Sequence, residues 1–90
     1  MKQDELLGEL ESLATQLQVT IRYEKGDFEG GYCILRDAKI LLVNKRLMPG
    51  RRTSVLALAM HEIGLDNLFI KPAVREYIED EVTRALRAAR

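Results

Sequence analysis

Several residue types are scarce in this sequence, and each scarcity excludes a class of protein. The 90 residues include one cysteine, Cys33, and no tryptophan. A single cysteine excludes a disulfide within the chain, which fits a reducing compartment. Basic and acidic residues number 14 each, so the formal net charge is zero. No overall field draws this protein toward nucleic acid or an anionic membrane, and any such contact has to be local.

Long apolar runs are also lacking. None approaches the roughly 18 residues that a membrane-spanning helix needs. The first residues, MKQDELLGELESL, carry acidic groups where a signal peptide requires a basic start and an uninterrupted apolar stretch. We therefore expect a cytoplasmic protein without a membrane contact. Hydrophobic residues make up 47% of the chain and charged residues 31%, a balance typical of a globular protein, and the length fits one domain, 1–90.

The first half of the chain predicts a helix followed by three strands. Residues 4–18 place apolar side chains at helical spacing, and 19–24 then alternate with a period of two. The glycines of 25–31 predict a turn that closes a hairpin. Further strands are expected over 31–36 and 39–44, which gives a three-stranded antiparallel sheet. Both of these strands are apolar on two faces, so we expect both faces of the sheet to be covered, by helices or by a second subunit.

Two more helices are predicted after the strands. Pro49 suits the first turn of a helix, and Gly64 suits its end because glycine readily adopts the positive φ found there. Pro72 likewise suits a helix start, and an apolar stripe follows it. The predicted fold is therefore α+β, with the order helix, three strands, buried helix and C-terminal helix (α-β-β-β-α-α).

The segment RRTSVLALAMHEIGLD carries the only histidine, His61, followed by Glu62. In the H-E-x-x-H helix of zinc peptidases, two imidazoles four residues apart converge on one metal, and the glutamate polarises its water. Leu65 occupies the position of the second histidine here. The motif is therefore degenerate.

The order of elements and the HE pair resemble the core of the zincin metallopeptidases. The segment GGYCILRDAKILLVNKRLMPGRRTSVLALAMHEIG is similar to the ImmA/IrrE-type branch, in which a strand ending in asparagine precedes an arginine-containing helix entry and the HE pair. Those positions are Asn44, Arg51 or Arg52, His61 and Glu62. The resemblance covers about a third of the chain. It implies a zincin-core-like fold in a small bacterial protein of degenerate, metallopeptidase-like type.

A metal-dependent hydrolase is one alternative function. Glu62 would be its catalytic residue, and His61, Cys33 and Glu79 are the candidate zinc ligands. Catalytic zinc ordinarily takes three protein ligands, and the spacing here does not supply them. We expect a partly buried structural histidine instead, because its helical neighbours are apolar: Ala57, Leu58 and Leu65. Cys33 is expected to be a small buried hydrophobic residue of a strand.

A local basic cluster, Lys45, Arg46, Arg51 and Arg52, follows the third strand. It could contact phosphates, so weak nucleic-acid binding is a second alternative, although no nucleic-acid motif accompanies it. Phe28 lies at a loop tip, where an aromatic ring either folds back on the core or marks a contact surface.

These patterns favour a non-catalytic binding or interaction module without a cofactor, with zinc only in the hydrolase alternative. An unknown protein or a second copy of the chain is the expected partner. The surplus of apolar residues on the second and third strands is the argument for self-association.

Overall fold

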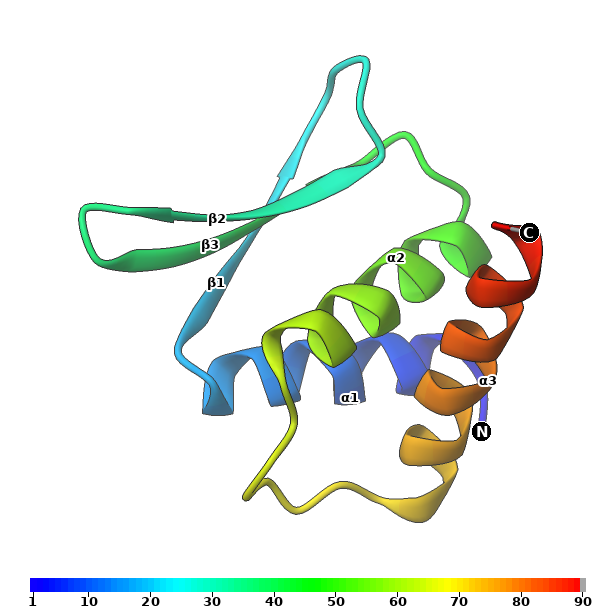
Figure 1. Cartoon of the computed structure of the whole chain (residues 1–90). Helices are drawn as coiled ribbons and strands as arrows, with labels where there is room; N and C mark the ends of the chain where they lie inside the picture. Colours follow the sequence, from blue (N-terminus) through cyan, green and yellow to red (C-terminus); the bar gives the residue numbers. More distant parts are fainter. Residues whose placement is uncertain (90) are drawn as a thin grey trace.

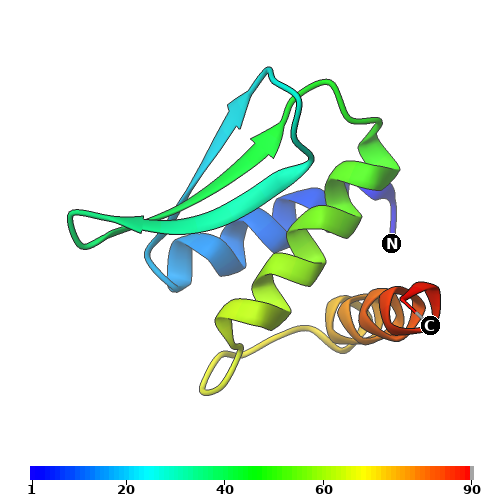
Figure 2. The same ribbon diagram turned by 45° about the horizontal axis from the view of Figure 1, so that its top comes forward.

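The computed structural model describes residues 1–89, which form three helices and one sheet. In chain order the elements are α1 (Gln3–Gln16), β1 (Val19–Glu24), β2 (Gly30–Leu35), β3 (Ala38–Asn44), α2 (Pro49–Ile63) and α3 (Pro72–Ala88). The predicted α+β class and element order are confirmed. All three helices lie on one side of the sheet: α1 and α2 pack against it, and α3 packs on these two helices away from the strands (Figures 1 and 2).

The sheet is mixed, with strand order β1-β3-β2. β3 pairs in parallel with β1 and in antiparallel fashion with β2, so the prediction of a purely antiparallel sheet is wrong for one pairing. β3 carries the buried Leu41 and Val43 and takes the central position, where neighbours cover it on both sides. The loop of residues 25–29 therefore carries the chain past the end of β3, and it does not close the predicted β1–β2 hairpin.

A tight hairpin joins β2 to β3. Leu35 pairs with Ala38, and the two residues between them, Arg36 and Asp37, have positive φ angles of 50° and 69°. Two successive positive φ angles are typical of the turn whose twist matches paired strands. The turn lies slightly earlier than predicted, and the end of the hairpin extends beyond α1 and α2 (Figure 1).

The outer face of the sheet has no helix over it (Figure 2). The register places Cys33 beside Ile40 and Gly31 beside Leu42 on this face. Cys33 is exposed, and Ile40 and Leu42 are half-buried. The prediction of a buried Cys33 is therefore wrong within the single chain, because all the helices pack on the other face. A helix does not supply the second cover, and cover by a second subunit stays a prediction.

The core lies between the inner face of the sheet and the helices. Its fully buried side chains come from every helix and from β3; the largest are Leu10, Leu41, Leu56, Met60 and Ile78. Both proline positions are confirmed as helix starts, since Pro49 and Pro72 stand in the first turns of α2 and α3. Gly64 ends α2 with a φ of 105°, and its N–H donates a 3.0 Å hydrogen bond to the carbonyl of Met60. Within residues 1–89, no helix has both the length and the apolar character needed to cross a membrane.

Candidate interaction surface

His61 lies on the last turn of α2 and is exposed, as is Glu62. The predicted partly buried histidine is therefore wrong. Of its apolar neighbours only Ala57 is buried, whereas Leu58 and Leu65 are half-buried. This side of α2 lies at the edge of the core, and a side chain there extends into solvent.

The three candidate zinc ligands come from different parts of the fold. Cys33 is on the outer face of β2, His61 is at the end of α2, and Glu79 is exposed on α3. Among residues 1–89, no group of three or more histidine, cysteine, aspartate or glutamate side chains has the arrangement of a metal site. The described residues therefore offer no preformed set of ligands for zinc in which Glu62 would act.

The basic cluster divides into two engaged and two exposed side chains. Arg51 forms a two-pronged ion pair with Glu29, and this pairing lowers the pKa of the carboxyl group and raises that of the guanidinium. Arg52 lies over the ring of Tyr23, with its guanidinium carbon 5.5 Å from the ring centre, and donates to the Lys45 carbonyl at 2.8 Å. Lys45 and Arg46 are exposed. Arg51 and Arg52 thus hold neighbouring loops in place, and Lys45 and Arg46 are the exposed members of the cluster.

Asn44 organises the loop that precedes β2. Its side-chain N–H groups donate to the carbonyls of Gly26 and Phe28 at 2.8 and 2.7 Å, and its carbonyl oxygen accepts from the N–H of Arg46 at 3.0 Å. The Phe28 ring folds back over Gly26, where a Cβ atom would clash with it. Phe28 is half-buried against its own loop and is not among the partly buried side chains that pack on the core of residues 1–89, so the alternative of a ring folded onto the core is not confirmed and a contact surface at Phe28 stays a prediction.

A groove of about 170 Å³ runs between β2 and α2. Its apolar walls include Tyr32, Val55 and Leu58, and its charged residues are Glu29, Arg51 and Glu62. Binding pockets for small molecules typically have volumes of about 300–1,000 Å³, whereas an apolar cavity of roughly 150 Å³ holds one benzene ring. The groove is therefore the size of a single side chain.

Gly30 sets the width of this groove. A Cβ atom there would lie 2.7 Å from Cγ1 of Val55 and 2.9 Å from the carbonyl oxygen of Leu42. Glycine lets α2 approach the strand closely, and the Val55 side chain takes the place that a side chain at position 30 would occupy.

β2 is an edge strand, and its hydrogen-bonding pattern can be worked out from one contact. The N–H of Asn44 donates to the carbonyl of Glu29 at 2.9 Å, which makes this a hydrogen-bonded pair of the β2–β3 ladder. Such pairs alternate along an antiparallel ladder, so Gly31, Cys33 and Leu35 also face β3. The backbone groups of the intervening residues, Gly30, Tyr32 and Ile34, therefore face outward.

The two edges of the sheet differ in how they are protected. Charged side chains on an edge strand oppose pairing with another chain. β1, at one edge, carries Arg22 and Glu24, whereas β2, at the other, has no charged residue. Ile34 and Leu35, at the end of β2, are 64% and 59% exposed. Within residues 1–89, only the β2 edge combines an uncharged strand with an adjacent apolar groove.

Two other hollows are less suited to a partner. One, of about 200 Å³, lies between α1 and the residues before α3, where Phe69 is 84% exposed and Lys71 pairs with Glu9 at 2.7 Å. The other lies beside β1 and is lined by Glu11, Thr15, Tyr23 and neighbouring residues. The first hollow has an exposed aromatic residue but does not adjoin an edge strand. The second adjoins the edge strand β1, which carries charged residues.

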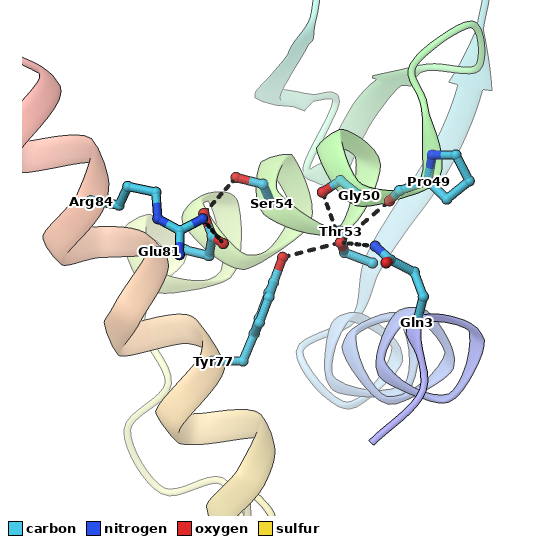
Figure 3. Close-up of polar contacts among 8 residues, drawn as sticks. All are labelled: Gln3, Pro49, Gly50, Thr53, Ser54, Tyr77, Glu81 and Arg84. Atoms are coloured by element: carbon cyan, nitrogen blue, oxygen red, sulfur yellow. Dashed lines mark hydrogen bonds and ion pairs between the residues drawn. The ribbon is translucent and has the colours of Figure 1, made fainter.

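A polar cluster at the junction of the helices was not predicted. Thr53 accepts hydrogen bonds from Gln3 and from the Tyr77 hydroxyl, each 3.0 Å long (Figure 3). Beside it, Ser54 donates to the buried carboxylate of Glu81. No cavity opens on this cluster among those described above, and its bonds join α1, α2 and α3. Glu81 stands three residues after Ile78 and seven after Val74, so a charge within the apolar stripe of α3 was the available signal.

A scan against protein-family models found no matching family, and searches of curated proteins and of solved structures found no significant match to this chain.

Proposed function

We propose that this protein is a non-catalytic interaction module that binds an extended polypeptide segment along β2. The observation that carries the proposal is the uncharged edge strand, with the backbone groups of Gly30, Tyr32 and Ile34 facing outward beside an apolar groove. A segment that adds a strand to a sheet edge gains affinity from main-chain hydrogen bonds and specificity from pockets that accept alternate side chains.

The groove supports one apolar side chain as the specificity element of such a segment. Its volume is that of a single ring or branched aliphatic group, and Val55, Leu58 and Tyr32 supply apolar contacts. The zincin resemblance is part of the same proposal, since a scaffold of that type without the second histidine of its motif retains surfaces for binding rather than a catalytic centre.

A library of random 12-residue peptides displayed on phage tests the proposal. Peptides selected on the wild-type protein are synthesised and added to isotope-labelled protein. We expect the amide signals of Gly30, Tyr32 and Ile34 to shift, because an added strand bonds to the outward groups.

Ile34→Lys is the matched variant. Ile34 is largely exposed, so the fold should be kept, while the charge opposes an incoming strand. We expect its affinity for the selected peptides to fall at least about tenfold, as the loss of roughly 1.4 kcal/mol implies. Selected peptides that shift only signals near Phe69 or near Lys45 and Arg46 would contradict the proposal, as would equal affinity for the variant.

A further inference from the structure

The β2 edge is complementary to itself. Of the outward-facing residues, Gly30 has no side chain and lines the groove on the inner face, whereas Ile34 carries an apolar side chain on that same face with most of its surface in solvent. Gly30 at the groove and the exposed Ile34 are four residues apart on one strand. Two such strands in antiparallel arrangement bring each Ile34 opposite the other copy's Gly30.

We infer that the segment bound along β2 is the β2 strand of a second copy, paired about a two-fold axis at Tyr32; this inference rests on the function proposed above. In this register Tyr32 lies opposite Tyr32 of the second copy, and Gly30 opposite its Ile34. All three residues have outward-facing backbone groups, so the pairing makes up to about six hydrogen bonds. The two sheets become one continuous sheet of two copies.

A register shifted by two residues is less favourable. With the axis at Cys33, Tyr32 would face the second copy's Ile34, and Gly30 would face Arg36, which belongs to the turn and has a φ of 50°. Only two of the outward-facing residues would then pair within the strand. No apolar side chain of the second copy would then lie opposite Gly30 at the groove.

The charges of the groove do not oppose a second copy. At one end of the groove Arg51 is already paired with Glu29, and Glu62 lies on α2 toward the other end. A two-fold axis reverses the direction of the second helix, so the paired end of each groove, rather than a second Glu62, faces the Glu62 end of the other. A stable interface buries roughly 1,200–2,000 Å². The flanks of both α2 helices therefore have to contribute with the strands.

Light scattering after size-exclusion chromatography measures the mass in solution. We expect twice the monomer mass for the wild-type protein at high concentration and dissociation on dilution. Ile34→Lys should raise the dissociation constant at least about a hundredfold, because both copies lose a buried isoleucine. Thr20→Lys, on β1 at the opposite edge, is the matched control and should leave the dimer intact.

Disulfide cross-linking tests the register. In the register centred on Tyr32, Gly31 lies opposite the second copy's Cys33 at a non-hydrogen-bonded position, where Cα atoms are about 4.5 Å apart, within the roughly 4.4–6.8 Å that a disulfide spans. A Cβ atom on Gly31 meets no other atom within 4 Å, so Gly31→Cys has room. With oxidised glutathione as the oxidant, this variant should form a covalent dimer, whereas the wild-type protein should not.

The outcomes separate this inference from the proposed function. The protein could be monomeric at every concentration while its Gly30, Tyr32 and Ile34 amides still respond to selected peptides. That result would overturn the inferred dimer and would leave the proposed peptide-binding function intact. A dimer unaffected by Ile34→Lys would overturn the β2 interface. Rapid cross-linking of the wild-type protein through Cys33 would overturn the register. Hydrogen exchange gives a check without a new cysteine: amide protection of Tyr32 and Ile34 should rise with protein concentration, and protection independent of concentration would count against the pairing.

Discussion

Ser54 Oγ donates a 2.9 Å hydrogen bond to Oε2 of Glu81, and this bond joins α2 to α3 inside the protein. The Glu81 side chain is buried, and its other oxygen accepts a longer bond from Arg84, at 3.4 Å. A buried carboxylate that loses a donor retains its desolvation cost without compensation. We therefore expect Ser54→Ala to lower the free energy of unfolding by about 1–3 kcal/mol in urea titrations.

Ser12→Ala is the control for that change. Ser12 is exposed on α1, so the same substitution in a helix should alter the free energy of unfolding by no more than about 0.5 kcal/mol. Similar losses in the two variants would show that the bond to Glu81 contributes nothing of its own.

The Tyr23 hydroxyl predicts a loss of stability at high pH. Burial, together with its 2.6 Å hydrogen bond to Glu11, raises the pKa of this group well above its ordinary value of 10.0. The unfolded chain releases the proton first as pH rises, so the stabilisation is complete below about pH 10 and is lost as pH rises through the folded pKa. We expect the free energy of unfolding to begin to fall near about pH 10 and to keep falling as the pH is raised further.

Tyr23→Phe removes the titrating hydroxyl and should reduce this pH dependence. Some dependence should remain, because burial also raises the pKa of Tyr77. Unfolding curves of the variant that fall as steeply with pH as those of the wild-type protein would rule out Tyr23 as a source.

The amide of Asn44 predicts a different kind of loss. Asn44→Asp replaces a donor of two bonds, to the carbonyls of Gly26 and Phe28, by a carboxylate that only accepts. We expect the free energy of unfolding to fall by about 1–3 kcal/mol, since two loop carbonyls lose their partner and a buried charge faces them. Asn67→Asp makes the same chemical change at an exposed turn residue and should change stability by less than about 0.5 kcal/mol.

The exposed His61 gives a prediction about zinc. Because its side chain extends into solvent, His61→Ala should leave the free energy of unfolding within about 0.5 kcal/mol of the wild-type value. Elemental analysis of the purified protein should find less than one zinc per chain, and added zinc should not raise the melting temperature. A zinc-dependent rise that His61→Ala abolishes would favour the hydrolase alternative.

The helices and strands that the sequence predicts correctly are those determined by residues close together in the chain. Pro49, Pro72 and Gly64 bound their helices as predicted, because φ preference and a missing N–H act within one turn. The order of the strands depends on contacts between distant segments, and the alternation within each strand does not specify its neighbour. The sequence therefore predicts that β1 pairs with β2, although β3 lies between them.

At the candidate interaction surface, too, the sequence predicts local features but not the contacts between distant segments. The sequence predicts the surplus of apolar residues on the second strand, but it also predicts a buried Cys33, because nothing in the pattern GGYCIL indicates an edge strand. The prediction for His61 is wrong for a related reason, since apolar neighbours on a helix mark a buried face only where another element covers it. The groove beside Gly30 depends on how closely α2 approaches the strand, a distance set by Val55 on a different element.

The mixed sheet also bears on the order in which the strands pair during folding. The β2–β3 hairpin is closed by neighbours in the chain, whereas β1 reaches β3 only through pairs such as Val19 with Lys39, twenty residues later. Closing the longer loop costs more chain entropy before any contact compensates for it, so β1 should join a preformed hairpin late in folding. Mutations in β1 should then mainly accelerate unfolding, while those in the hairpin should slow the folding step itself.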